Sequence, residues 1–249
     1  MNIGLYQSAS ALSALERWQE SVSQNIASSQ TTGYRKHTVN FSTQPAGEIK
    51  PGAGIRMGQG EGVQSIFPKV NTGINFISGE TQPTRRDLDI AIQGDGFFEV
   101  QLPDGSRAYT RNGEFHQRAD RTLVTSAGHE VLSDGGGPIT LLPNGAPLII
   151  NRDGTMFQGD ASLGRISVQR FADNSQLTAI AGGFFVPSPG MPPQASDKPE
   201  LMQGYLEGSN VTPMREMVDL ISISRAYEAN QKIISSVDRQ MQKALEALG

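Results

Sequence analysis

The sequence predicts an α+β chain that is mainly β, with an antiparallel β body and an elongated stalk. In this stalk the N- and C-terminal helices pair in a coiled-coil-like manner. Two observations predict the fold. The 28 glycines and 14 prolines favour turns, and short apolar runs recur between turn signals in the middle of the chain. At both ends, apolar residues instead recur three and four positions apart, as they do on amphipathic helices.

Residues 1–33 are predicted to form the N-terminal helix. Its apolar residues follow the spacing of a coiled-coil seam, and the seam positions are Leu5, Leu12, Leu15, Val22 and Ile26. Thr31-Thr32-Gly33 is expected to stop the helix, because glycine readily takes a positive φ.

Residues 34–75 are rich in Gly, Pro, Gln and Ser and show little periodicity, so we expect an extended connector. Residues 76–196 are predicted to be an antiparallel β domain with a turn roughly every ten residues. The run LDIAIQ alternates, so Leu88, Ile90 and Ile92 are expected to point inward and the residues between them outward. The GDG that follows is expected to be a hairpin turn.

Residues 197–249 are predicted to be a proline-rich linker followed by the C-terminal helix. Thr212-Pro213 is a good helix start, since threonine caps and proline suits the first helical position. The seam positions are Leu220, Ile223, Tyr227, Asn230, Ile234, Val237, Met241 and Leu248. The polar Asn230 is of the type that fixes register in such seams. Neither helix can bury its stripe alone, so the two are expected to pair and to carry subunit contacts.

Composition argues against several functional classes. The net charge is −4 and no basic cluster suits a polyanion such as nucleic acid. The chain has no cysteine, and His37, His116 and His129 lack metal-ligand spacing. We therefore expect no catalytic residues, no cofactor and no metal. The N-terminus lacks a basic start and an unbroken apolar core, so no cleaved signal peptide and no membrane-spanning segment are expected.

Two alternatives remain open at this point. The chain could be a monomeric binding module whose β body recognises a ligand, with the helices as a stalk. Uniform resistance to protease would favour that reading, whereas a self-assembling subunit should have sensitive ends and a resistant core over 76–196. An enzyme would need a pocket with converging, perturbed carboxylates.

Several motifs resemble those of bacterial flagellar rod and hook proteins. NIASSQTTGYRK is similar to the family segment that ends the N-terminal helix, and GDGFFEV and EGSNVTP…RAYE are similar to its central and C-terminal motifs. The matching residues are Asn25, Ala27, Thr31, Thr32, Gly33, Gly94, Gly96, Phe97, Phe98, Ser209, Asn210, Val211, Arg225, Ala226, Tyr227 and Glu228. The chain is too short for a typical hook protein, and it fits the rod proteins of FlgF or FlgG type. Its length favours the proximal, FlgF type.

The resemblance implies a structural subunit of the flagellar basal-body rod, and it implies no enzyme. Subunits would stack helically into a hollow shaft that spans the periplasm, transmits torque from motor to hook and supports motility. The implied partners are copies of the chain, other rod and hook proteins and the flagellar type III export apparatus. Nucleic acid, a small-molecule substrate and direct membrane insertion are not expected.

Overall fold

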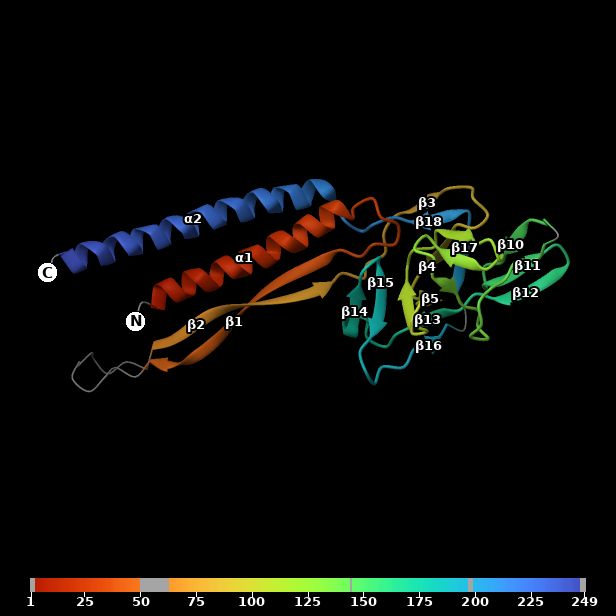
Figure 1. Cartoon of the computed structure of the whole chain (residues 1–249), viewed down its shortest axis with the longest axis horizontal. Coiled ribbons are helices and arrows are strands. Elements are labelled where there is room, and N and C mark those ends of the chain that lie inside the picture. The colour runs from red at the N-terminus through yellow and green to blue at the C-terminus, as the bar shows by residue number, and fades with distance from the viewer. Residues whose placement is uncertain (1–2, 50–62, 144, 197–198, 247–249) are drawn as a thin grey trace. The chain divides into compact units, whose positions relative to one another are not determined.

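The computed structural model describes residues 3–49, 63–143, 145–196 and 199–246, and Figure 1 shows the chain. The chain divides into two compact units. Unit 1 comprises Met1–Ala27, His37–Gly73 and Thr212–Gly249, and unit 2 comprises Ser28–Lys36 and Ile74–Val211.

Unit 1 contains both helices and a two-stranded ribbon. Its elements are α1 (Ile3–Ala27), β1 (His37–Ile49), β2 (Val63–Ile74) and α2 (Pro213–Glu246). The strands β1 and β2 pair and run in opposite directions, and α1 contacts both α2 and β1 (Figure 1). The rings of Trp18 on α1 and Phe41 on β1 meet edge to face, with centroids 5.5 Å apart.

The start of α2 confirms the prediction made from Thr212-Pro213. The carbonyl of Thr212 accepts the backbone N–H groups of Arg215 and Glu216 at 3.0 and 3.2 Å. The bond from Glu216 is the first regular bond of the helix, and the bond from Arg215 occupies a donor that a helix start otherwise leaves free. The segment expected to be an extended connector contains β1 and β2. These two strands form a two-stranded sheet of their own. The hydrophobic periodicity of the segment is low, which fits a ribbon that is not built into a larger sheet.

Unit 2 is built from antiparallel sheets. The largest sheet comprises β5 (Phe97–Gln101), β6 (Arg107–Thr110), β7 (Phe115–Gln117), β8 (Leu123–Thr125), β9 (Glu130–Val131), β13 (Val168–Arg170), β14 (Leu177–Ile180), β15 (Phe184–Pro187) and β16 (Gln194–Ala195). Its main order is β14-β15-β6-β5-β9-β8-β7, and β13 pairs with both β5 and β16. The strand β5 therefore lies at the centre of this sheet, so a change in it should disturb many neighbours.

Three smaller sheets complete unit 2. Their strands are β3 (Thr81–Pro83), β4 (Ile90–Gln93), β10 (Leu148–Ile150), β11 (Thr155–Gln158), β12 (Ala161–Arg165), β17 (Glu200–Gln203) and β18 (Tyr205–Glu207). The pairings are β10-β11-β12, β4-β17 and β3-β18. A short 3-10 turn, η1 (Asn174–Gln176), precedes β14.

Phe97 and Phe98, the first two residues of β5, belong to two different apolar clusters. Phe98 is fully buried in the main cluster, and its ring meets that of Phe115 edge to face at 5.1 Å. Phe97 belongs to a smaller cluster with Tyr109, Leu177 and Phe185. Successive side chains on a strand point to opposite faces, so β5 is covered on both sides.

Two details of the predicted hairpin at GDG are wrong. The strand β4 pairs with β17, whereas β5 pairs with β6, β9 and β13, so the turn passes the chain between sheets. Asp89 and Ala91, expected to point outward, are 0% and 1% exposed. Alternation fails here because the strand is buried on both faces, and Arg86 lies 3.7 Å from the Asp89 carboxylate.

The fold class is confirmed as α+β and mainly β, with antiparallel sheets and two long helices. Neither helix, over the residues described, has a stretch apolar enough to cross a lipid bilayer.

Replacing Phe98 with alanine should destabilise unit 2 by about 3 to 5 kcal/mol, because the cavity left at the centre of β5 cannot close fully. Hydrogen exchange of the β5 backbone amides across a urea series measures the change, because the single tryptophan, Trp18, lies in unit 1 and would report on that unit. The matched control is Ile149→Ala on β10, where the side chain is 51% exposed. A Phe98→Ala loss no larger than that of the control would contradict this packing.

Candidate functional site: helix faces and buried polar clusters

The predicted seam is the least exposed face of α2. Ile223 is 0% exposed, and the half-buried seam residues are Leu220, Tyr227, Asn230, Ile234 and Val237. Off the seam, Ile221 and Ile233 are 55% and 52% exposed. The Met241 side chain and Leu248 lie outside the described parts of the chain. The seam is thus turned toward the rest of unit 1, and its role in subunit contacts stays a prediction.

The α1 seam has the same character. Val22 is 2% exposed, and Leu12, Leu15 and Ile26 are half-buried. The side chain of Leu5 lies outside the described part.

Asn25 holds three elements of unit 1 together. Its amide Nδ2 donates to the carbonyl of His37 at 2.8 Å and to Glu216 Oε2 at 3.0 Å. Its Oδ1 accepts the N–H of His37 at 2.8 Å. Asn25 and Glu216 are each 1% exposed, and they connect the end of α1 to the starts of β1 and α2. The two helices therefore run antiparallel, with this polar contact at one end.

Asn230, predicted to mark register, donates Nδ2 to the carbonyl of Ala226 at 2.9 Å. This hydrogen bond lies within α2. The bond from Asn25 to Glu216 does join the two helices, and any register role of Asn230 between subunits stays a prediction.

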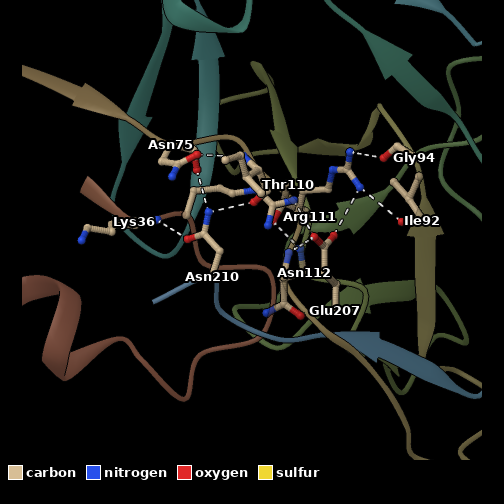
Figure 2. Close-up of polar contacts among 12 residues, drawn as sticks. Lys36, Asn75, Ile92, Gly94, Thr110, Arg111, Asn112, Glu207 and Asn210 are labelled. Atoms are coloured by element: carbon tan, nitrogen blue, oxygen red, sulfur yellow. Dashed lines mark hydrogen bonds and ion pairs between the residues drawn. The ribbon is translucent and has the colours of Figure 1, made fainter. Parts of the chain in front are cut away.

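A buried ion cluster in unit 2 centres on Glu207 (Figure 2). Glu207 Oε1 accepts hydrogen bonds from Arg35 Nη2 at 2.7 Å and from the N–H of Gly79 at 2.8 Å. Its Oε2 accepts one from Arg111 Nη1 at 3.2 Å. The side chains of Arg35, Arg111 and Glu207 are 1%, 4% and 2% exposed. Hydrogen-bonded charges of this kind are worth more than neutral pairs, and they are costly to leave unpaired.

Arg111 extends the cluster to the edge of β4. Its guanidinium donates to the carbonyl oxygens of Ile92 and Gly94 at 3.3 and 2.5 Å (Figure 2). It also lies 5.3 Å from the centroid of the Phe97 ring. Burial lowers the pKa of Arg111 to about 10, and the attraction of Glu207 opposes that shift. The group stays charged at neutral pH, so Glu207 has two cations to balance.

Asn210, from the predicted SNV motif, joins three chain segments beside this cluster (Figure 2). Its Oδ1 accepts the N–H of Lys36 at 2.7 Å. Its Nδ2 donates to the carbonyls of Asn75 and Ile77, each at 2.8 Å. The amide therefore uses both of its ends, and it ties segment 28–36 to segments 74–79 and 207–211.

The TTG motif lies in the same region of unit 2. Thr32 Oγ1 donates to Asn112 Oδ1 at 2.8 Å, and Gly33 N–H donates to the carbonyl of Glu207 at 2.7 Å. Gly33 has φ +68°, and a Cβ there would lie 2.4 Å from the backbone nitrogen of Asn112. Only glycine fits this position without a shift of the backbone.

The other predicted motif residues are spread over the fold. Gly94 and Gly96 have φ +87° and +138°, as the GDG turn requires. Ser209 Oγ accepts the N–H of Val211 at 3.2 Å. Thr31, Ala27, Arg225 and Glu228 are exposed, whereas Ala226 and Tyr227 are half-buried.

Two surface hollows of unit 2 bear on the enzyme alternative. One, of about 350 Å³, is lined in part by Arg118, His129 and Glu130, and the other, of about 340 Å³, by Arg152, Asp153 and Glu200. Hydrogen bonds from Thr155 lower the pKa of Asp153, which is the behaviour of a turn-capping carboxylate. Within the described ranges, no three histidine or acidic side chains gather closely enough to hold a metal ion.

Sequence reasoning missed Glu207 and Arg111, the central residues of the ion cluster. Both stand beside buried strand residues, in YLEG and YTRNG, where a solvated charge is not expected. That position is the signal that could have revealed them, but only the folded structure shows that they meet.

Comparison with known protein families gives two matches. Residues 202–247 match the family described as flagellar basal body rod FlgEFG protein C-terminal. Residues 91–158 match the flagellar hook protein FlgE/F/G D1 domain. Together they cover the α2 seam and the centre of unit 2.

Curated relatives align over nearly the whole chain. A flagellar basal-body rod protein FlgF of Caulobacter vibrioides is 36% identical over 100% of this chain and 99% of its own length. A FlgF of Mesorhizobium japonicum is 30% identical with the same coverage. A flagellar basal-body rod protein FlgG of Borreliella burgdorferi is 33% identical over 95% of each chain.

Replacing Glu207 with glutamine should lower the stability of unit 2 by about 3 to 5 kcal/mol, because two buried guanidinium groups lose their counter-charge. The urea midpoint measures this. Glu200→Gln is the matched control, because Glu200 is the exposed first residue of β17, and the expected change is about 0.5 kcal/mol or less. Equal midpoints for the two variants would show that the cluster does not stabilise the unit.

Gly33→Ala and Gly94→Ala form a second matched pair. Both glycines have positive φ, but a Cβ at Gly94 would meet nothing within 4 Å. Gly94→Ala should cost only the backbone strain, about 1 to 2 kcal/mol. Gly33→Ala should cost clearly more, because its Cβ would overlap the backbone at Asn112. Thermal unfolding of both variants tests this, and a smaller loss at Gly33 would refute the close approach.

Proposed function

This chain belongs to the flagellar basal-body rod protein family, and from that premise we propose that it polymerises helically into the hollow rod that transmits torque from motor to hook. The end-to-end alignment with relatives named as rod proteins carries the proposal. The family is a class of structural proteins rather than of enzymes. Its relatives locate the chain in the basal body of the flagellum.

The proposal assigns the two helices to a coiled-coil-like, elongated stalk. Three features of unit 1 support it: the contact between α1 and α2, their antiparallel course, and the exclusion of Ile223 from solvent. Seam residues on both helices would hold the stalk, and the β strands of unit 2 would set the lateral spacing of subunits.

We assign the chain to the proximal, FlgF type of rod protein. Relatives named FlgF align over all of this chain, whereas the FlgG relative of Borreliella burgdorferi aligns over 95%. Electron microscopy of basal bodies from a strain that lacks the chain tests the assignment. A rod cut short within its proximal part is expected, and a complete proximal part without a distal part would overturn the assignment.

The remaining partners follow from the same proposal. The chain would assemble with copies of itself and with other rod and hook proteins, and these contacts would support motility. It would reach the periplasm through the flagellar type III export apparatus.

Replacing both Ile223 and Ile234 with aspartate should abolish incorporation into rods, because the seam would then place charges against apolar side chains. Motility and the rods in purified basal bodies measure incorporation. Unit 2 should stay folded, as a protease-resistant fragment of the purified variant would show.

Ile233→Asp is the matched control, because this neighbouring isoleucine is 52% exposed and lies off the seam. It should leave motility close to normal. Normal rods in the Ile223→Asp, Ile234→Asp variant would refute the assembly role of the seam.

A further inference from the structure

The start of α2 carries an apolar face that unit 1 does not cover. Met214, Met217, Val218 and Ile221 are 71%, 47%, 56% and 55% exposed. On a helix with 3.6 residues per turn, this face lies opposite Ile223, which is 0% exposed. A cluster of large apolar side chains left in water marks an interaction surface.

Basic residues continue the same line along α2. Arg225, Lys232, Arg239 and Lys243 are exposed and follow Met214, Val218 and Ile221 at spacings of three, four or seven residues. Glu228 and, three residues past Lys243, Glu246 are exposed acidic residues on the same face. None of the four basic groups forms an ion pair with any residue that the structure describes. We call this line, from Met214 to Lys243, the outer stripe of α2.

The exposed side of α1 has the opposite character. One line of exposed positions, spaced four and three residues apart, comprises Ala9, Ser13, Glu16, Glu20, Ser23 and Ala27, and the exposed Gln19 and Gln24 lie outside this line. We call this line the outer stripe of α1. The four small side chains leave room for bulky neighbours, and the two carboxylates form no ion pair within the described chain. Arg17 lies to one side of the stripe.

We propose that the outer stripe of α2 docks on the outer stripe of α1 of a second copy of this chain. The proposal rests on the proposed function and names the surfaces through which copies meet. Size and charge both match: large apolar and basic residues on one stripe face small and acidic residues on the other. Because the two stripes differ and each copy carries both, the contact is heterologous and can repeat without closing.

A charge-reversal series tests the proposal with the full-length chain. Glu16→Lys with Glu20→Lys should place like charges on both stripes, as should Arg225→Glu with Lys232→Glu. Sedimentation at rising protein concentration should show at least about a tenfold increase in the concentration needed for assembly. The chain with all four changes should regain much of the lost assembly, because the opposite charges face each other again.

Lys69→Glu with Arg170→Glu is the matched control, since it changes the net charge as much as the α2 double variant does and both residues are exposed. It should assemble like the parent chain. Normal assembly of both single-stripe variants, or no recovery in the four-fold variant, would overturn the proposal.

Cross-linking identifies the partner of each stripe. In a mixture of isotope-labelled and unlabelled chains, a carbodiimide should join Lys232 or Lys243 to Glu16 or Glu20 across copies, giving cross-links of mixed label. Cross-links of one label only would mean contact within a chain and would overturn the inference. Cross-links from these residues to another flagellar protein in purified basal bodies, with none between copies, would also overturn it.

The two levels of proposal fail differently. If the Ile223→Asp, Ile234→Asp variant loses assembly while the charge reversals do not, the stripes are not the interface and the rod function stands. If the parent chain forms no assembly and its deletion leaves the rod intact, both proposals fall.

Discussion

Unit 2 depends on one carboxylate. The Glu207 carboxylate accepts hydrogen bonds from three donors. These are the guanidinium of Arg35 in segment 28–36, the backbone N–H of Gly79 and the guanidinium of Arg111, which follows β6. Arg35 reaches Glu207 through Nη2, while its Nε and Nη1 have no hydrogen-bond partner among the described residues. The Glu207 carboxylate therefore supplies the balancing charge of this buried guanidinium. Removing either partner of a buried ion pair costs more than the pair itself contributes. The cluster therefore holds Glu207 together with the segments that carry Arg35, Gly79 and Arg111.

In unit 1, a buried polar side chain also joins separate chain segments, but it is the neutral amide of Asn25 and not a charged group. The Asn25 amide satisfies both backbone groups of His37 and reaches the buried Glu216 carboxylate. In both units, some of the motif residues that resemble rod proteins lie where the chain passes from one element to the next: Asn25 near the end of α1, Gly33 between α1 and β1, and Asn210 between β18 and α2. Gly33, Asn25 and Asn210 are needed because a backbone turns or a backbone polar group would otherwise be buried without a partner.

Local rules predicted much of this fold from sequence. The three-and-four spacing predicted α1 and α2, Thr212-Pro213 predicted the start of α2, and the glycine turns predicted a β-rich centre. Sequence could not predict that β4 pairs with β17, because strand partners far apart in sequence leave no local mark. It placed Asp89 outside, because alternation assumes one solvated face. Sequence reasoning also missed the Glu207 cluster, because its charged partners are far apart in sequence. Arg35 lies 172 residues from Glu207, and Arg111 lies 96 residues from it.

The inward and outward faces of α2 carry different kinds of side chain. A helix that only covered α1 would need one apolar stripe, but α2 also exposes four large apolar residues near its start and basic residues beyond them. The apolar part gains free energy by leaving water, without direction. The charged part contributes little affinity but disfavours wrong registers and like-charged partners. Because these parts follow one another along the helix, the apolar residues can hold a neighbour while the charges select its position.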